Sequence, residues 1–147
     1  MLGTIAKKLR MFGFDCKYDS SIADDCLMLI AKKENRIIIT KDSKLAINAI
    51  QHNITTITLQ AATEKDQLIA IAKKINCKKF TLEHSRCSIC NGVINITSKD
   101  QLTQKIPLKI VKSMEKFWQC DRCAHIYWIG SHIINMEKLV AELNNEL

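Results

Sequence analysis

The chain has 147 residues, of which 47% are hydrophobic and 25% are charged, and Lys and Arg outnumber Asp and Glu by 22 to 15. This length suits one compact α/β domain with a small metal-stabilised module, and the composition excludes a disordered or low-complexity chain. The net charge of +7 favours a polyanionic partner without identifying it, and solubility alone is an alternative explanation of such a charge.

Apolar residues at helical spacing predict a first helix over residues 2–12, which Gly13 ends. Its basic side chains, Lys7, Lys8 and Arg10, are expected to face solvent. No small-residue cleavage site follows this segment, and no apolar run approaches the roughly 20 residues that span a bilayer. We therefore expect a soluble, cytoplasmic protein.

A short strand at residues 14–18 and a helix over residues 20–35 are predicted next. Serines at the start of this helix are expected to cap it, and Asn35 is expected to end it. The apolar residues at helical spacing along it are Ile22, Cys26, Leu29 and Ile30.

Two β-branched runs, residues 36–40 and 54–59, predict strands, and a helical pattern separates them. A further helix over residues 68–75 is preceded by Thr63 and Asp66 in a variant of the capping box. Strands joined through helices form parallel sheets, so we expect an α/β fold with sites at the carboxyl ends of its strands.

The pattern changes after Lys79, because residues 85–130 hold two CxxC pairs, the only proline and both tryptophans. We place a domain boundary near residue 80. This gives an α/β domain over residues 1–80, a zinc ribbon over residues 81–132 and an amphipathic C-terminal helix over residues 133–147.

Four cysteines form the two pairs, namely Cys87, Cys90, Cys120 and Cys123. Four thiolates suit a tetrahedral zinc ion, and they leave no open coordination position, so the zinc would be structural. An odd total of seven cysteines without a signal peptide argues against disulfides. His84 and His125 are alternative ligands that a complete four-cysteine site does not need. The other cysteines are expected to be buried apolar side chains, namely Cys16, Cys26 and Cys77.

Three acidic residues are candidate catalytic groups. Asp42 follows a predicted strand, and Asp24 with Asp25 opens the preceding helix. Carboxylates gathered at the carboxyl edge of a sheet bind Mg²⁺ or Mn²⁺ for phosphodiester hydrolysis. The alternative is structural, with Asp24 and Asp25 complementing a helix dipole and Asp42 capping the next helix, and spacing alone favours this alternative.

Basic and aromatic side chains are candidates for RNA binding, since cations hold phosphates and rings stack on bases. The candidates are Lys7, Arg10, Lys41, Arg86, Lys109, Lys112, Trp118, Arg122, Tyr127, Trp128 and His132. The alternative is that the aromatic rings form the core of the ribbon and the lysines are merely solvated.

Five segments, taken in order along the chain, closely resemble the Mut7-C RNase-domain family. They are MLGTIAKKLRMFGFD, YDSSIADDCLMLIA, IIITKD, SRCSICNG and CAHIYWIGSHI. The resemblance implies a three-layer α/β/α PIN-like domain with a parallel sheet, fused to a zinc ribbon held by the four paired cysteines. It also implies metal-dependent RNA cleavage, with Asp24 or Asp25 and Asp42 at the acidic positions.

The family pattern has a strand ending in a catalytic aspartate just before the MLG segment, and the sequence does not show it. Cys26 also stands where the family often has an acid. We therefore expect an RNA-binding relative of metal-dependent endoribonucleases, associated with a large RNA assembly such as the ribosome, with a protein partner completing its sheet. One alternative is an active Mg²⁺- or Mn²⁺-dependent endoribonuclease with Lys41 or Arg10 near the scissile phosphate. Another is a protein-interaction module.

Overall fold

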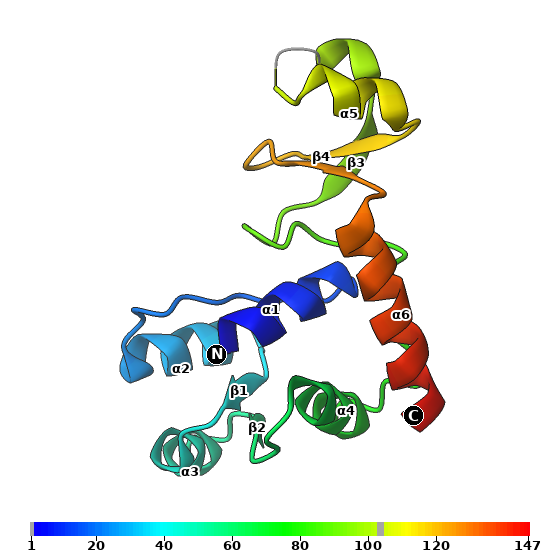
Figure 1. The fold of residues 1–147 in the computed structure, drawn as a ribbon. Coiled ribbons are helices and arrows are strands. Elements are labelled where there is room, and N and C mark those ends of the chain that lie inside the picture. The colour runs from blue at the N-terminus through cyan, green and yellow to red at the C-terminus, as the bar shows by residue number, and fades with distance from the viewer. Residues whose placement is uncertain (1, 103–104) are drawn as a thin grey trace. The chain divides into compact units, whose positions relative to one another are not determined.

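The structure is a computed structural model that describes residues 2–102 and 105–147, and it is a mixed α/β protein (Figure 1). Its strands are β1 (Ile38–Thr40), β2 (Thr56–Thr58), β3 (Ile94–Thr97), β4 (Phe117–Cys120) and β5 (Ile126–Trp128). The first two form a parallel pair, and the last three form an antiparallel sheet in the order β3-β4-β5.

The chain divides into two compact units. The first comprises Met1–Ile5, Tyr18–Lys79 and Glu146–Leu147, and the second comprises Ala6–Lys17 and Phe80–Asn145. The helix α1 (Leu2–Met11) contributes residues to both units. No helix in the described part of the chain has the length and apolar character that crossing a membrane requires.

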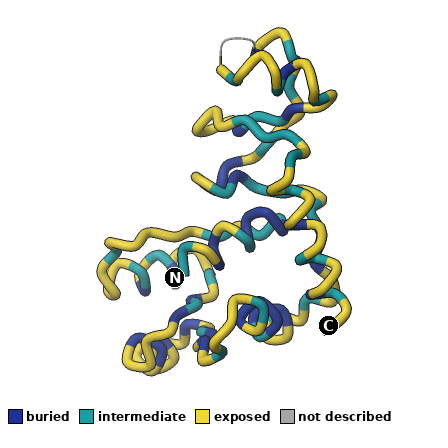
Figure 2. Tube along the Cα trace, in the orientation of Figure 1, coloured by how far each residue is buried: buried dark blue, intermediate teal, exposed yellow. Residues whose placement is uncertain are grey.

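The first unit contains the helices α2 (Asp24–Lys33), α3 (Ser43–Gln51) and α4 (Glu64–Lys74). One of its core clusters is formed by Met28, Ala31, Ile38, Leu45, Ala49 and Ile54. The two predicted strands are confirmed as the short parallel pair β1 and β2, in which Ile39 lies opposite Ile57. Figure 2 shows buried stretches in α1 and α4, whereas α2 and α3 are largely exposed.

Asparagine ends three helices of this unit in the same way. Asn35, Asn53 and Asn76 have φ values of 52°, 59° and 57° at the ends of α2, α3 and α4. This left-handed conformation is one that asparagine tolerates, and it lets the next N–H group reach back to a carbonyl of the last turn. The ending predicted at Asn35 is thus confirmed. The capping pair is confirmed as well, since the Thr63 hydroxyl accepts a hydrogen bond from the Asp66 N–H at 3.1 Å.

The helix α1 ends as predicted, at Gly13 with a φ of +90°. The Phe14 N–H donates to the Leu9 carbonyl and the Gly13 N–H donates to the Arg10 carbonyl, which together form a Schellman motif. The expectation that Arg10 faces solvent is wrong, because this side chain is only 6% exposed.

The strand predicted at residues 14–18 does not form. Its backbone is bonded to side chains instead, since the Cys16 N–H donates to Asn91 Oδ1 and the Cys16 carbonyl accepts from Arg10 Nε. Backbone groups that are already paired in this way cannot also join a sheet.

Two expectations for α2 are corrected. Its N-cap residue is Ala23, and no side chain caps it, whereas Ser21 donates from its N–H and hydroxyl to Asp19 instead. The face that α2 buries carries Met28 and Ala31, not the predicted set. Leu29 is 68% exposed and Cys26 is also exposed, so Cys26 is not a buried apolar side chain. Cys16 and Cys77 are half-buried.

The second unit holds the antiparallel sheet, a short 3₁₀ helix η1 (Lys99–Gln101), and the helices α5 (Leu108–Ser113) and α6 (Ser131–Glu146). Its fully buried side chains include Phe80, Leu102, Phe117 and Leu143. The Phe12 and Phe80 rings pack with their centroids 4.8 Å apart. The predicted C-terminal helix is α6, which buries Met136 and Leu143.

Candidate metal centre

The four cysteines of the CxxC pairs meet at one point of the second unit, and we call them the cysteine tetrad. The Cys87 and Cys123 sulfur atoms lie 3.6 Å apart. The Cys90 and Cys120 sulfur atoms lie 3.4 Å apart, and all four lie within 4.8 Å of one another. Thiolates around a zinc ion at about 2.3 Å have sulfur atoms about 3.8 Å apart, so the tetrad can hold zinc.

The first CxxC pair lies in a tight turn. The Asn91 N–H donates to the Cys87 carbonyl at 2.8 Å, and the Cys87 N–H donates to the Gly92 carbonyl at 2.9 Å. A Cβ atom at Gly92 would lie 2.7 Å from the Cys120 sulfur and 3.1 Å from Arg122 Cβ. Glycine is therefore required here to keep the sulfur atoms close together, and this crowding fits a metal-binding turn.

The second CxxC pair repeats the same hydrogen bonds. The Ala124 N–H donates to the Cys120 carbonyl at 3.1 Å, and the Cys120 N–H donates to the His125 carbonyl at 2.9 Å. The Arg122 and Cys123 N–H groups point at the Cys120 sulfur, at 3.4 and 3.5 Å. Donors aimed at sulfur stabilise a thiolate, which is the form that binds zinc.

Tyr127 supports the first turn from β5. Its hydroxyl lies 3.1 Å from the Cys87 sulfur and accepts a hydrogen bond from the Ser88 N–H at 3.1 Å. Burial and the Cys87 thiol raise the pKa of Tyr127 to about 12, so the phenol keeps its proton near neutral pH. This placement makes Tyr127 a support of the tetrad, a role that the sequence pattern did not reveal.

Two thiols of the tetrad, Cys87 and Cys123, have pKa values shifted in opposite directions. Burial raises the pKa of Cys87, but hydrogen bonds from Tyr127 and from the Cys90 and Ile89 N–H groups lower it to about 7. The His125 N–H lowers the pKa of Cys123, yet burial and the neighbouring thiols raise it to about 12. Four sulfur atoms this close cannot all be negative unless a cation lies between them, so a bound metal would release the remaining protons.

A buried arginine joins the first turn to α1. Arg10 Nε donates to the Cys16 carbonyl at 2.8 Å, and Arg10 Nη1 donates to the Ser88 and Ile89 carbonyls at 2.9 and 3.2 Å. Ser88 and Ile89 are the two residues between Cys87 and Cys90. The guanidinium thus holds the backbone that positions the first two thiols.

Asn91 makes a second connection to the same segment. Its side chain accepts from the Cys16 N–H at 3.1 Å and donates to Asp15 Oδ1 at 2.6 Å. The carbonyl of Asn91 accepts from Arg86 Nη1 at 3.0 Å. The Asn-Gly dipeptide directly after the first CxxC pair predicts a turn, but it does not predict that the Asn91 side chain bonds Cys16 and Asp15.

The three acidic candidates do not form a group that could hold a metal ion. Oδ1 of Asp42 accepts from the Lys44 and Leu45 N–H groups at 2.8 and 3.2 Å, so Asp42 caps α3. Asp24 and Asp25 are exposed in the first turn of α2. Within residues 2–102 and 105–147, the cysteine tetrad is the one group of three or more His, Cys, Asp or Glu side chains placed to hold a metal ion. The geometry of Asp42 therefore fits the alternative given above, in which this residue caps a helix.

The RNA-binding candidates differ in their accessibility. The exposed ones are Lys7, Lys41, Lys109, Lys112, Arg122 and His132, and the half-buried ones are Arg86, Trp118, Tyr127 and Trp128. Arg10 differs from the other candidates, because it is buried and its guanidinium donates to three backbone carbonyls, so it is not accessible to RNA in this structure. Trp128 packs on the buried Phe117 with ring centroids 6.3 Å apart, as the alternative of an aromatic core predicts.

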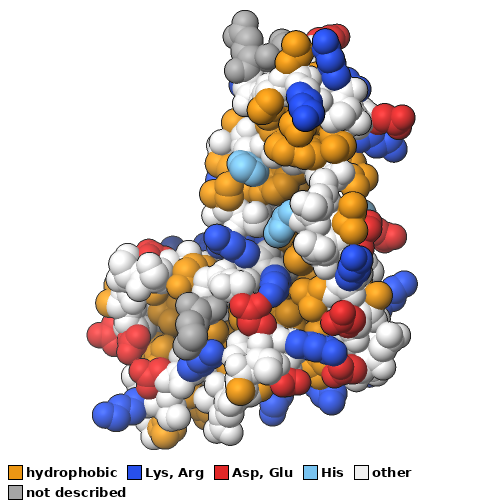
Figure 3. Space-filling view, in the orientation of Figure 1, with side chains coloured by type: hydrophobic (Ala, Val, Ile, Leu, Met, Phe, Trp, Pro, Cys, Tyr) orange, Lys and Arg blue, Asp and Glu red, His pale blue; other side chains and the backbone are white. Residues whose placement is uncertain are grey.

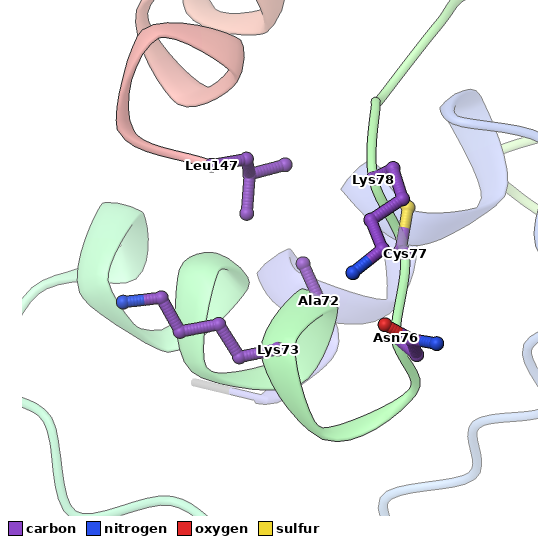
Figure 4. A pocket seen from close by; sticks show the side chains of 6 residues that line it. All are labelled: Ala72, Lys73, Asn76, Cys77, Lys78 and Leu147. Carbon is purple, nitrogen blue, oxygen red and sulfur yellow. The ribbon is translucent and has the colours of Figure 1, made fainter.

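A small pocket in the first unit does not resemble an active site (Figure 4). Its volume is about 160 Å³, whereas ligand pockets usually measure about 300–1,000 Å³. Its lining residues are Ala72, Lys73, Asn76, Cys77, Lys78 and Leu147. None of the acidic candidates lines it.

The fold and the tetrad define a mixed α/β protein in which one unit carries four cysteines that could hold a metal ion and the other unit carries a parallel strand pair. The family model of the Mut7-C RNAse domain matches residues 1–140 of the 147. The chain therefore belongs to the Mut7-C RNAse domain family, as its sequence motifs predicted. This membership indicates a nuclease-like function that involves RNA. Comparison with curated proteins and with solved structures gives no match.

Proposed function

We propose that this protein binds RNA through its second compact unit, as a PIN-like relative of metal-dependent endoribonucleases that associates with a large RNA assembly such as the ribosome. The match of residues 1–140 to an RNAse domain carries the proposal. The net charge of +7 supports it, because cationic side chains gain affinity for RNA by releasing counterions. Zinc in the closed tetrad would organise the fold and would perform no chemistry.

The segment that joins β3 to β4 also supports the proposal. Residues 98–116 contain five lysines against Asp100 and Glu115. In α5, Val111 is buried while Lys109 and Lys112 are exposed three residues apart, so both lysines lie on one side of the helix. This arrangement offers two neighbouring cations to an RNA backbone.

We expect binding of labelled RNA to weaken steeply as salt rises, and the double variant Lys109→Glu/Lys112→Glu to weaken it about tenfold at low salt. Each phosphate contact that is lost should lower the slope of log K against log salt by about 0.7 for single strands. Filter binding over a salt titration measures both quantities.

The matched control is Lys73→Glu/Lys74→Glu, which makes the same charge change at two exposed lysines of α4. Equal losses in the two double variants would mean that only net charge matters and that the second unit holds no RNA site. Affinity that does not respond to salt would favour the protein-interaction alternative.

The family match also favours a second candidate function, an active endoribonuclease that uses Asp24, Asp25 and Asp42 with Mg²⁺ or Mn²⁺. Asp42→Asn tests it cleanly, because asparagine caps helices as well as aspartate does and should preserve α3. If this candidate is right, cleavage of labelled RNA should fall at least about a hundredfold in the variant while its thermal unfolding is unchanged. Metal-dependent cleavage at the wild-type rate in Asp42→Asn would exclude it.

A further inference from the structure

We propose that one face of the sheet β3-β4-β5 is a stacking surface for single-stranded RNA, with Trp118 at its centre. This inference rests on the RNA binding proposed above and adds its location and the kind of RNA.

The register of the sheet determines which side chains share a face. Ile96 lies opposite Trp118, and Trp118 lies opposite Tyr127, so these three side chains point to the same face. We call them the middle row.

The opposite face of the sheet contributes Phe117 to the protein core. Thr97, Phe117 and Trp128 are paired across the strands and form the neighbouring row. Phe117 is completely buried, and its ring packs against Trp128. The middle row therefore lies on the other side of the sheet, where Ile96 is 68% exposed. Both tryptophans are half-buried, and the register places Trp128 beside the buried Phe117 and Trp118 on the face that carries the exposed Ile96.

None of the strand residues that the register places on the face of the middle row is acidic. Strand alternation places Ile94 and Cys120 on the same face at the end near the tetrad, with His125 beside them. His125 is exposed, and its ring lies 4.7 Å from the Tyr127 ring. At the other end, Lys116 directly precedes β4 and is exposed. The face thus combines an apolar and aromatic centre with a cation at its edge.

Ile129 directly follows β5 and is 50% exposed. Figure 3 shows hydrophobic side chains gathered over β3 and β4 in the view it gives, with Lys and Arg side chains along α5. Ile96 and Ile129 are exposed while the Trp118 and Tyr127 rings are half-buried, and a partly exposed apolar patch of this kind is typical of an interaction site. Because residues 98–116 are rich in lysine, they favour a polyanionic partner over an apolar protein surface.

The chemistry of this face suits unpaired bases. A flat sheet with a tryptophan at its centre offers a ring on which a base can stack, while lysine at the edge reaches the phosphates. In duplex RNA the bases are stacked on each other and their faces are inaccessible. The expected ligand is therefore a single-stranded segment, or a loop within a larger RNA.

Two neighbouring residues of β3 give a matched test, because Ile96 and Asn95 are both exposed and point to opposite faces. Ile96→Asp and Asn95→Asp add the same charge one residue apart. For a 12-nucleotide oligouridylate binding to the 147-residue chain, we expect Ile96→Asp to lower affinity about tenfold and Asn95→Asp to lower it less than about twofold. Zinc content and circular dichroism would verify that both variants are folded.

Trp118 gives an independent test. Trp118→Leu should lower affinity about tenfold, and Trp118→Phe should retain most of the binding because it keeps a ring for stacking. Blunt duplex RNA should bind more weakly than the oligouridylate. The inference is overturned if both aspartate variants bind alike, if Leu and Phe at position 118 are equivalent, or if the duplex binds as tightly.

The remaining outcomes identify which proposal has failed. If Ile96→Asp changes the oligomeric state in sedimentation and leaves RNA affinity intact, the face is a protein interface and the inference is wrong. If the wild-type protein shows no salt-sensitive affinity for any RNA, the proposed function itself is wrong. If RNA binding responds to Lys109→Glu/Lys112→Glu but not to changes in the middle row, the proposed function stands and only the stacking surface is lost.

Discussion

Cys120→Ser should abolish zinc binding and unfold the second compact unit. Cys120 is 3% exposed, and its sulfur accepts hydrogen bonds from two N–H groups of its own turn. Structural zinc contributes about 10–16 kcal/mol of apparent folding free energy in small zinc modules, and serine is a far weaker ligand than a thiolate. We expect less than about one tenth of the zinc content of the wild type and the loss of cooperative unfolding of this unit. Zinc analysis and thermal circular dichroism measure the two effects.

The matched control is Cys26→Ser, which changes an exposed cysteine outside the tetrad. It should keep full zinc content and shift the free energy of unfolding by no more than about 0.5 kcal/mol. A chelator added to the wild type should reproduce the Cys120→Ser result, because it removes the same ion. Full zinc content in Cys120→Ser would mean that the metal has another set of ligands.

The features that the sequence predicted well are those that neighbouring residues determine. The tetrad follows from two CxxC turns, each of which sets its own thiols, and Gly13 and Asn35 end helices through their own backbone preferences. Thr63 caps α4 through a residue three positions away. Each helix end and each CxxC turn depends on atoms within about one turn of the chain, so the pattern of residues is sufficient to predict it. The meeting of the two CxxC turns follows instead from the preference of four thiolates for one tetrahedral ion.

The features that the sequence missed depend on partners that are distant along the chain. In α2, residues 26–31 are apolar without interruption, so helical spacing cannot choose which face packs on the core. The strand expected at residues 14–18 is lost to the side chain of Asn91, which is 75 residues from Cys16. The sorting of Trp118 and Trp128 onto opposite faces follows from strand register, which periodicity alone does not give.

Arg10→Met should destabilise the second unit by about 3–5 kcal/mol and weaken zinc binding about 10- to 100-fold. Methionine keeps the apolar length of the side chain but removes three hydrogen bonds, which leaves the Cys16, Ser88 and Ile89 carbonyls without their donor. These hydrogen bonds are part-buried, and a fully buried carbonyl left unpaired costs about 1–3 kcal/mol, so the sum should lie toward the lower end of three such losses. Outer contacts that hold a metal ligand typically contribute 10- to 100-fold in affinity. Denaturant unfolding and competition with a chromogenic chelator measure the two effects.

Two further variants separate the possible causes of that loss. Lys7→Met removes the same charge from an exposed position one turn earlier on α1, and it should change stability by no more than about 0.5 kcal/mol. Arg10→Lys keeps the charge, but one ammonium group cannot bond the Cys16 carbonyl and the carbonyls of the cysteine turn together, as the forked guanidinium does. Arg10→Lys should therefore resemble Arg10→Met more than the wild type. If Arg10→Lys behaved like the wild type, the charge alone would matter. The hydrogen bonds that join α1 to the first cysteine turn would then contribute little to zinc binding.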